Sequence, residues 1–300
     1  MLLSRDYKNG TYNAVVVLGA TATGKTAYAV KLAEENSGEI ISADSRQVYK
    51  NLNLGTGKDL FEYGNIPYHL IDICTLEKEY TVFDFQNGAY EAFTAIIAKN
   101  KLPIFAGGTG LYLDAVIRSY NLIPVPENKE LRHNLQNKTL KELQEMLLSL
   151  KPEIHNKTDL EQRERLLRAI EIADYNKTHP DAGKLSAARR PDIKPFIVGL
   201  RFPRSVLRSR IRTRLLKRID LGMIEEVKNL NGDGVSWQRL ESLGLEYKFT
   251  ALYLQGKIQS KEEYIESLYK AICRFAKRQE TWFRRMEKKG VEIRWIEGFG

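Results

Sequence analysis

The chain has 300 residues and a formal net charge of +9; 43% of its residues are hydrophobic and 28% are charged. This composition is typical of a globular protein, and no apolar run approaches the ~18 residues that a membrane helix needs. Two cysteines far apart in sequence and four histidines without metal-ligand spacing argue against a disulfide framework and a zinc site. We therefore expect a reduced cytoplasmic protein with no membrane segment and no export signal.

The first predicted elements surround a phosphate-binding motif. The apolar run 14–18 predicts a strand, and residues 27–33 predict a helix. Between them lies a P-loop, whose residues are Gly19, Ala20, Thr21, Ala22, Thr23, Gly24, Lys25 and Thr26. Backbone N–H groups and the helix N-terminus would hold a phosphate or diphosphate, Lys25 would add a charge, and the Thr26 hydroxyl suits a shared Mg²⁺ ion. The motif alone leaves open whether the ligand is a nucleotide such as ATP.

Two further segments follow predicted strands. The strand 39–42 leads to Asp44, which could serve as a metal-bound acid, a general base or a helix cap. The strand 103–106 leads to Gly-Gly-Thr-Gly, where glycines let the backbone approach a ligand and Thr109 presents a hydroxyl; a structural turn is the alternative. The Gly-rich segment 53–58 carries a weak signal, and a surface turn is its simpler interpretation.

Strands that alternate with helices predict an α/β fold with a parallel sheet. After a further predicted strand at 68–73 and helix at 83–99, the pattern is interrupted, and it resumes in two late strands, at 196–200 and 291–296. The interruption contains three predicted helices and ends in a predicted loop: 130–135, 139–150, 160–175 and then 177–195. We predict a P-loop NTPase-like parallel sheet flanked by helices, formed by residues 1–123 and 196–300, with an inserted helical subdomain at 124–195.

The last third of the chain concentrates positive charge. Residues 201–218 contain eight Lys or Arg and no acid, and residues 274–289 contain seven against two acids. The helix predicted at 206–219 has an apolar side (Leu207, Ile211, Leu215 and Ile219), and on another face Arg210, Arg214 and Arg218. On the helix predicted at 264–285, a basic stripe lies opposite an apolar side formed by Ile265, Leu268, Ile272, Phe275 and Phe283. Such stripes are typical of nucleic-acid binding and also of ordinary solvated helices.

These motifs together resemble one family. G-A-T-A-T-G-K-T at 19–26, I-S-A-D-S-R-Q-V-Y at 41–49 and G-G-T-G-L-Y at 107–112 are similar to the tRNA dimethylallyltransferases, or tRNA isopentenyltransferases. The resemblance continues through most of the chain in the expected order, at 165–171, 207–214, 222–227 and 276–284. It departs at 242–248, where the family's glycine and tyrosine are adjacent but Gly244 and Tyr247 are separated.

The resemblance implies transfer of a dimethylallyl group from dimethylallyl diphosphate to N6 of the adenosine at tRNA position 37, next to the anticodon, with release of diphosphate. It implies that the P-loop holds the diphosphate with Mg²⁺ on Thr26, that Arg210 and Arg214 contact the same diphosphate, and that Thr109 lies near the bridging oxygen. Asp44 is the expected base for the N6 proton. The expected contacts to the tRNA anticodon stem-loop are Asp44, Ser45, Arg46, Gln47, Thr109, Arg132, Arg165, Arg168, Lys277, Arg278, Gln279 and Arg284.

Three other activities fit parts of the sequence. A small-molecule or nucleotide kinase would use the same P-loop with ATP, but it explains the late basic helices less well. An enzyme that prenylates free adenine nucleotides would not need the helical insert. A non-catalytic RNA-binding module would use the P-loop ligand only structurally, and its RNA binding would survive Asp44→Ala. We expect tRNA prenyl transfer by a monomer.

Overall fold

The structure is a computed structural model that describes residues 11–151, 162–181 and 190–297. It divides into two compact units, Met1–Tyr120 with Pro191–Gly300, and Asn121–Arg190. The sequence prediction placed the insertion at 124–195, so the two descriptions of the second unit differ by a few residues at each end. No helix in the described ranges combines the length and the apolarity needed to cross a membrane.

The first unit contains a six-stranded parallel sheet, which confirms the predicted fold class. The order of the strands is β3 (Tyr68–His69), β2 (Gly38–Ser42), β4 (Leu102–Gly107), β1 (Ala14–Gly19), β5 (Pro195–Arg201) and β6 (Arg294–Glu297). The central strand β1 is buried along its whole length and pairs with β4 on one side and β5 on the other. The sheet therefore joins the first and last parts of the sequence, as predicted.

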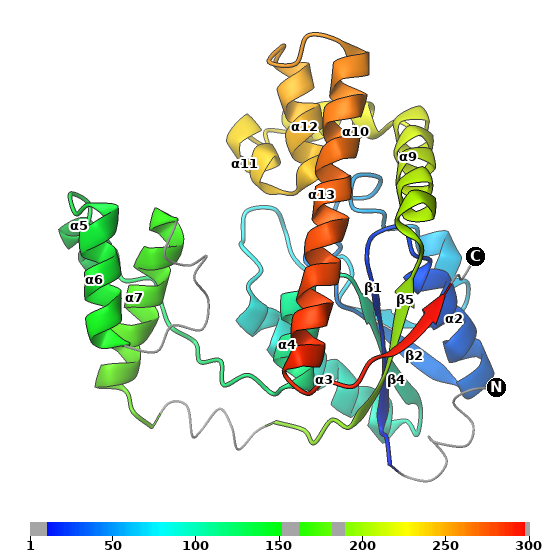
Figure 1. The fold of residues 1–300 in the computed structure, drawn as a ribbon, viewed down its shortest axis with the longest axis horizontal. Coiled ribbons are helices and arrows are strands. Elements are labelled where there is room, and N and C mark those ends of the chain that lie inside the picture. The colour runs from blue at the N-terminus through cyan, green and yellow to red at the C-terminus, as the bar shows by residue number, and fades with distance from the viewer. Residues whose placement is uncertain (1–10, 152–161, 182–189, 298–300) are drawn as a thin grey trace. The chain divides into compact units, whose positions relative to one another are not determined.

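Helices cover both faces of this sheet, because successive side chains of a strand point to opposite faces. On one face Val15 and Val17 pack against α2 (Lys25–Asn36). On the other face Val16 and Leu18 belong to a cluster formed with α3 (Val82–Ala98), α4 (Gly110–Ile117) and the end of α13 (Lys261–Lys288). Figure 1 shows α2 on one side of the sheet and α3, α4 and α13 on the other.

The strand predicted at 68–73 is wrong beyond His69. Leu70 and Asp72 have φ angles of 62° and 56°, which a strand does not accommodate. The backbone here turns away from β2 and bonds to the loop that follows that strand instead: Asp72 N donates to Gln47 O at 3.1 Å and Ile73 N to Val48 O at 2.9 Å. Leu70 and Ile71 are buried without continuing the ladder, whereas Ile73 is 46% exposed.

Four shorter elements and a long helix follow β5. They are α9 (Arg204–Asp220), α10 (Met223–Gly232), α11 (Trp237–Ser242), α12 (Leu245–Leu254) and then α13. The predicted apolar side of α9 is confirmed, because Leu207, Ile211, Leu215 and Ile219 are all buried in one cluster with α13. In α13 the prediction for Phe275 is wrong, since its side chain is 38% exposed.

The second unit is helical, as predicted, with α5 (Lys129–Asn134), α6 (Leu140–Leu150) and α7 (Arg163–Thr178). Leu135, Leu143, Leu166 and Ile170 form its core. Thr139 and Glu142 form a capping box that starts α6. The first residues of the helix predicted at 160–175, and residues 182–189 of the predicted loop, lie outside the described ranges.

Candidate active site

Three loops meet at one edge of the sheet because β2, β4 and β1 are parallel neighbours. Their carboxyl ends are Ser42, Gly107 and Gly19, so the segment around Asp44, the Gly-Gly-Thr-Gly turn and the P-loop lie side by side. A crevice at the carboxyl ends of parallel strands is where open α/β sheets bind ligands. Gly107 has no space for a side chain, because a Cβ there would collide with the Ala43 carbonyl.

The P-loop is folded around its own backbone. Thr23 Oγ1 donates to Ala20 O at 2.8 Å, and Lys25 Nζ donates to the same carbonyl at 2.7 Å. Gly24 adopts φ 82°, which lets α2 begin at Lys25. Burial, and then the nearby Arg214 cation, lower the pKa of Lys25 to about 7, while Asp44 opposes this shift. Three charged groups therefore share one small region.

Two arginines of α9 reach this loop. Arg210 Nε donates to Ala22 O at 2.9 Å, and Arg214 Nη1 donates to Thr21 Oγ1 at 3.3 Å. Burial, and then the charge of Arg218, lower the pKa of Arg214 to about 10. The predicted diphosphate-binding residues are thus brought together by packing of α9 onto Ala20 and Ala22.

Asp44 and Thr109 lie on facing loops. Thr109 Oγ1 accepts from Ser45 N at 3.0 Å, and Thr109 N donates to Ala43 O at 3.2 Å. Asp44 Oδ1 accepts from Arg46 N at 2.8 Å, a turn that holds the carboxylate beside the loop backbone. The Asp44 carboxylate lies close enough to Lys25 and Arg214 to raise the pKa of both, and the Thr109 hydroxyl lies on the neighbouring loop. Their roles remain predictions.

Gln279 joins two of the three loops. Its Oε1 accepts from Thr21 N at 2.9 Å and its Nε2 donates to Gly108 O at 2.8 Å. The side chain is only 7% exposed. The sequence interpretation made Gln279 a tRNA contact, but both ends of its amide are bonded to backbone, so the structure gives it a bridging role. A signal was available, because Ile272, Ala276, Gln279 and Phe283 lie on one helix face.

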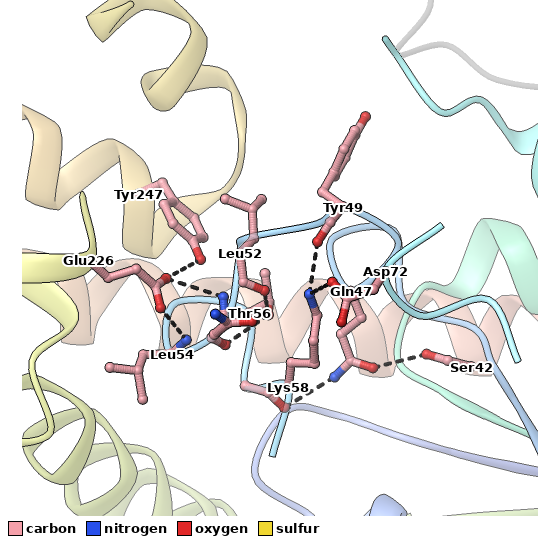
Figure 2. A network of polar contacts seen from close by, with 12 residues as sticks. Ser42, Gln47, Tyr49, Leu52, Leu54, Thr56, Lys58, Asp72, Glu226 and Tyr247 are labelled. Atoms are coloured by element: carbon pink, nitrogen blue, oxygen red, sulfur yellow. Dashed lines mark hydrogen bonds and ion pairs between the residues drawn. The ribbon is translucent and has the colours of Figure 1, made fainter. Parts of the chain in front are cut away.

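The segment 53–58 is not the surface turn that the sequence suggested. Lys58 is 6% exposed, and its ammonium donates to Tyr49 O at 2.8 Å and pairs with Asp72 at 2.5 Å. Gln47, expected to contact tRNA, donates through Nε2 to Gly57 O at 3.1 Å and accepts from Ser42 Oγ at 2.9 Å. Figure 2 shows this network. The segment is therefore part of the site.

The other residues predicted to contact tRNA fall into two groups. Lys277, Arg278 and Arg284 are exposed on α13, and Arg165 is exposed on α7. Arg132 and Arg168 instead surround the buried carboxylate of Glu171, at 2.7 and 2.9 Å. Burial raises the pKa of Glu171, but these two arginines and the Asn128 N–H outweigh it, and the net pKa is lowered.

The residues present fit a magnesium ion shared with a diphosphate better than a metal site built from protein alone. Among residues 11–151, 162–181 and 190–297, no three His, Cys, Asp or Glu side chains are grouped to hold a metal. Thr26 lies in the first turn of α2, beside the loop that would hold phosphate oxygens. Mg²⁺ is commonly bound in this way, by one or two protein oxygens together with substrate phosphates and water.

Two protein-family models match the chain. The model of the IPP transferase family matches residues 47–286, and the model described as isopentenyl transferase matches residues 12–63. A relative from Treponema denticola, named tRNA dimethylallyltransferase 2, is 69% identical over 285 residues, which are 95% of this chain and 96% of the relative.

Solved structures show the same similarity. The tRNA isopentenylpyrophosphate transferase of Bacillus halodurans is 32% identical, with a TM-score of 0.68, over 95% of this chain and 89% of that one. A eukaryotic dimethylallyltransferase acting on tRNA has a TM-score of 0.77 over 95% of this chain and 74% of its own, at 20% identity. The second comparison supports the fold.

Proposed function

The chain belongs to the IPP transferase family, and from that premise we propose that its P-loop binds the diphosphate of dimethylallyl diphosphate rather than a hydrolysable nucleotide. The protein is a transferase that modifies tRNA by prenyl transfer. The observation that carries the proposal for the donor is the convergence of Lys25, Arg210 and Arg214 on one P-loop, with Asp44 on the adjoining loop.

The cations would bind the donor and stabilise its leaving group. Lys25 and the P-loop N–H groups would hold the diphosphate, and Arg210 and Arg214 would add charge-assisted contacts to its oxygens. Negative charge grows on the diphosphate as its bond to carbon breaks, so fixed cations stabilise the transition state more than the ground state. Thr26 would hold Mg²⁺, which supplies further charge neutralisation of the diphosphate when it is bound.

Asp44 would act on the acceptor. The N6 nitrogen of adenine attacks C1 of the dimethylallyl group, a C–N bond forms, the C1–O bond breaks, and the diphosphate leaves with the electron pair. N6 must also lose a proton, and the Asp44 carboxylate would accept it. Thr109, whose hydroxyl lies on the facing loop, would contact the bridging oxygen of the donor.

The acceptor base has to leave the anticodon loop to reach this site, which costs a few kcal/mol. Ser45 and Arg46 adjoin Asp44 and would contact the extruded adenine. The tRNA phosphate backbone would bind the exposed cations of α13, which are Lys277, Arg278 and Arg284. In the second unit Arg165 is the exposed candidate, whereas Arg132 and Arg168 would act partly by ordering that unit. We place the reaction in the cytoplasm, where its tRNA substrate is found.

The test is mass spectrometry of nucleosides digested from unmodified tRNA after incubation with the protein, dimethylallyl diphosphate and Mg²⁺, without ATP. We expect a dimethylallyl-adenosine product from the anticodon loop. The matched control is the same reaction with ATP in place of dimethylallyl diphosphate, and it should give no modified nucleoside. A protein that binds tRNA but gives no product with this donor would contradict the proposal, and product from free AMP but not from tRNA would contradict the acceptor.

A further inference from the structure

One carboxylate of the C-terminal helices holds the 53–58 loop. Glu226 of α10 accepts from Leu54 N at 2.7 Å and from Asn53 N and Gly55 N, each at 3.3 Å. Its Oε1 also accepts from Tyr247 Oη at 2.5 Å. Figure 2 shows the Glu226 carboxylate between Tyr247 and the loop. Charge-assisted bonds of this kind are about twice as strong as neutral ones, so the loop backbone is tied firmly to α10.

Tyr247 makes this attachment rigid. Its side chain is 1% exposed and packs among Leu52, Val227 and Leu243. Burial, and then the Glu226 carboxylate, raise the pKa of Tyr247 well above its usual range, so its hydroxyl remains a donor. This is the tyrosine that the sequence comparison found displaced from Gly244. In this chain it supports Glu226 from inside the core.

The loop then contacts the site through Gly57. Its carbonyl accepts from Gln47 Nε2 at 3.1 Å, and the other end of that amide accepts from Ser42 Oγ at the end of β2. Gly57 has φ 66°, and a Cβ there would collide with the guanidinium groups of Arg214 and Arg218. The loop thus lies between the donor cations and the strand end that carries Asp44.

We propose that Glu226 is a positioning residue for prenyl transfer, acting through the 53–58 loop on Gln47 and so on the acceptor side of the site. This rests on the proposed function, because Gln47 adjoins the segment assigned to the adenine. Glu226 lies on α10, and within the described part of the chain its carboxylate bonds to the 53–55 backbone and to Tyr247, not to the P-loop or Asp44. Its effect on the reaction must therefore pass through the loop backbone.

The experiment compares steady-state tRNA prenylation by wild type, Glu226→Gln, Gln47→Ala and the double variant, with melting temperatures for each. Glu226→Gln keeps the shape of the side chain, but it removes the negative charge and replaces one of the two acceptor oxygens with an NH2 donor. We expect kcat/KM for tRNA to fall about ten-fold, equivalent to about 1.4 kcal/mol, with KM for the donor little changed. The double variant should be no worse than Gln47→Ala alone, because both changes break the same connection.

The matched control is Glu241→Gln. Glu241 lies in the same group of helices and accepts from Gln255 Nε2 at 3.0 Å, without touching the loop, and this variant should keep wild-type kinetics. Effects of Glu226→Gln and Gln47→Ala that multiply would show that the two residues act independently, and would overturn the proposal. Unchanged kinetics for Glu226→Gln would also overturn it. An inactive wild-type enzyme would contradict the proposed function instead.

Discussion

At the scale of single residues, the site brings several cations close together before any substrate arrives. Burial and then Arg214 lower the pKa of Lys25, burial and then Arg218 lower the pKa of Arg214, and the Asp44 carboxylate opposes both shifts. Arg218 adds another cation, paired with Asp59 at 3.6 Å. Crowded cations of this kind are stabilised by a bound anion, which is consistent with a diphosphate ligand.

Asp44→Asn separates the chemical role of this residue from its structural one. The amide oxygen can still accept from Arg46 N and keep the turn, but it is a far weaker base than the carboxylate. We expect kcat to fall about 10²- to 10⁴-fold, the usual contribution of a general base, while tRNA affinity stays within a few-fold. Single-turnover prenylation and filter binding on the same protein would measure both. An unchanged single-turnover rate would remove Asp44 as the base.

At the scale of elements, one buried carboxylate joins the strands on one side of the sheet. Glu39 of β2 is 1% exposed and binds His69 at 2.8 Å, Lys101 at 2.9 Å and Lys99 at 3.2 Å. These partners follow α3 or belong to β3. Burial would raise the pKa of Glu39, but the hydrogen bonds from Lys101, His69 and Lys99 outweigh it and lower the pKa to about 2.

This network predicts a pH dependence of stability. The folded carboxyl binds its proton less tightly than the unfolded one, so the stabilisation is present above about pH 5 and is lost as the pH falls toward 2. Glu39→Gln should lower the free energy of unfolding at pH 7 by about 2 kcal/mol. The difference in free energy of unfolding between wild type and Glu39→Gln should disappear as the pH falls, and urea unfolding at several pH values would measure it.

Glu145→Gln is the control for this experiment, because its pair with Lys141, at 4.0 Å, is exposed and should contribute little. A Glu39→Gln variant whose stability ran parallel to wild type from pH 7 to pH 3 would show that the network does not act through the charge.

The elements that sequence could predict are those whose causes are local. The strand β1, the P-loop and the helix α2 follow from a short stretch of residues, and so do the apolar side of α9 and the capped helix α6. The 53–58 loop could not be predicted in this way, because Glu226 and Tyr247 come from far along the chain. The inward position of Gln279 was visible only as a polar residue on an apolar helix face.

At the scale of the whole molecule, the net charge of +9 does not by itself indicate RNA binding. What matters is where the basic side chains lie on the surface. In α13, Arg278 is exposed and its neighbour Gln279 is buried, so these adjacent residues separate a surface role from an internal one. Counterion release makes the salt dependence of tRNA affinity report phosphate contacts alone.

Arg278→Ala should weaken tRNA binding and reduce the slope of log affinity against log salt by about 1. Gln279→Ala should lower the melting temperature and weaken donor binding, because it removes the link between the P-loop and Gly108, but it should leave that slope unchanged. Binding measured at four or five salt concentrations would decide. If the slope of log affinity against log salt for Arg278→Ala equals that of wild type, Arg278 makes no phosphate contact and this helix face is an ordinary solvated surface.

The link between Thr21 and Gln279 also has a consequence for biosynthesis. The two partners are 258 residues apart, and translation at 5–20 residues per second would separate their appearance by about 13 to 50 seconds. Until α13 leaves the ribosome, the nascent P-loop lacks the hydrogen bond from Thr21 N to Gln279. A ribosome-bound chain that ends before Gln279 should therefore capture the donor poorly, although it already carries every residue of the motif.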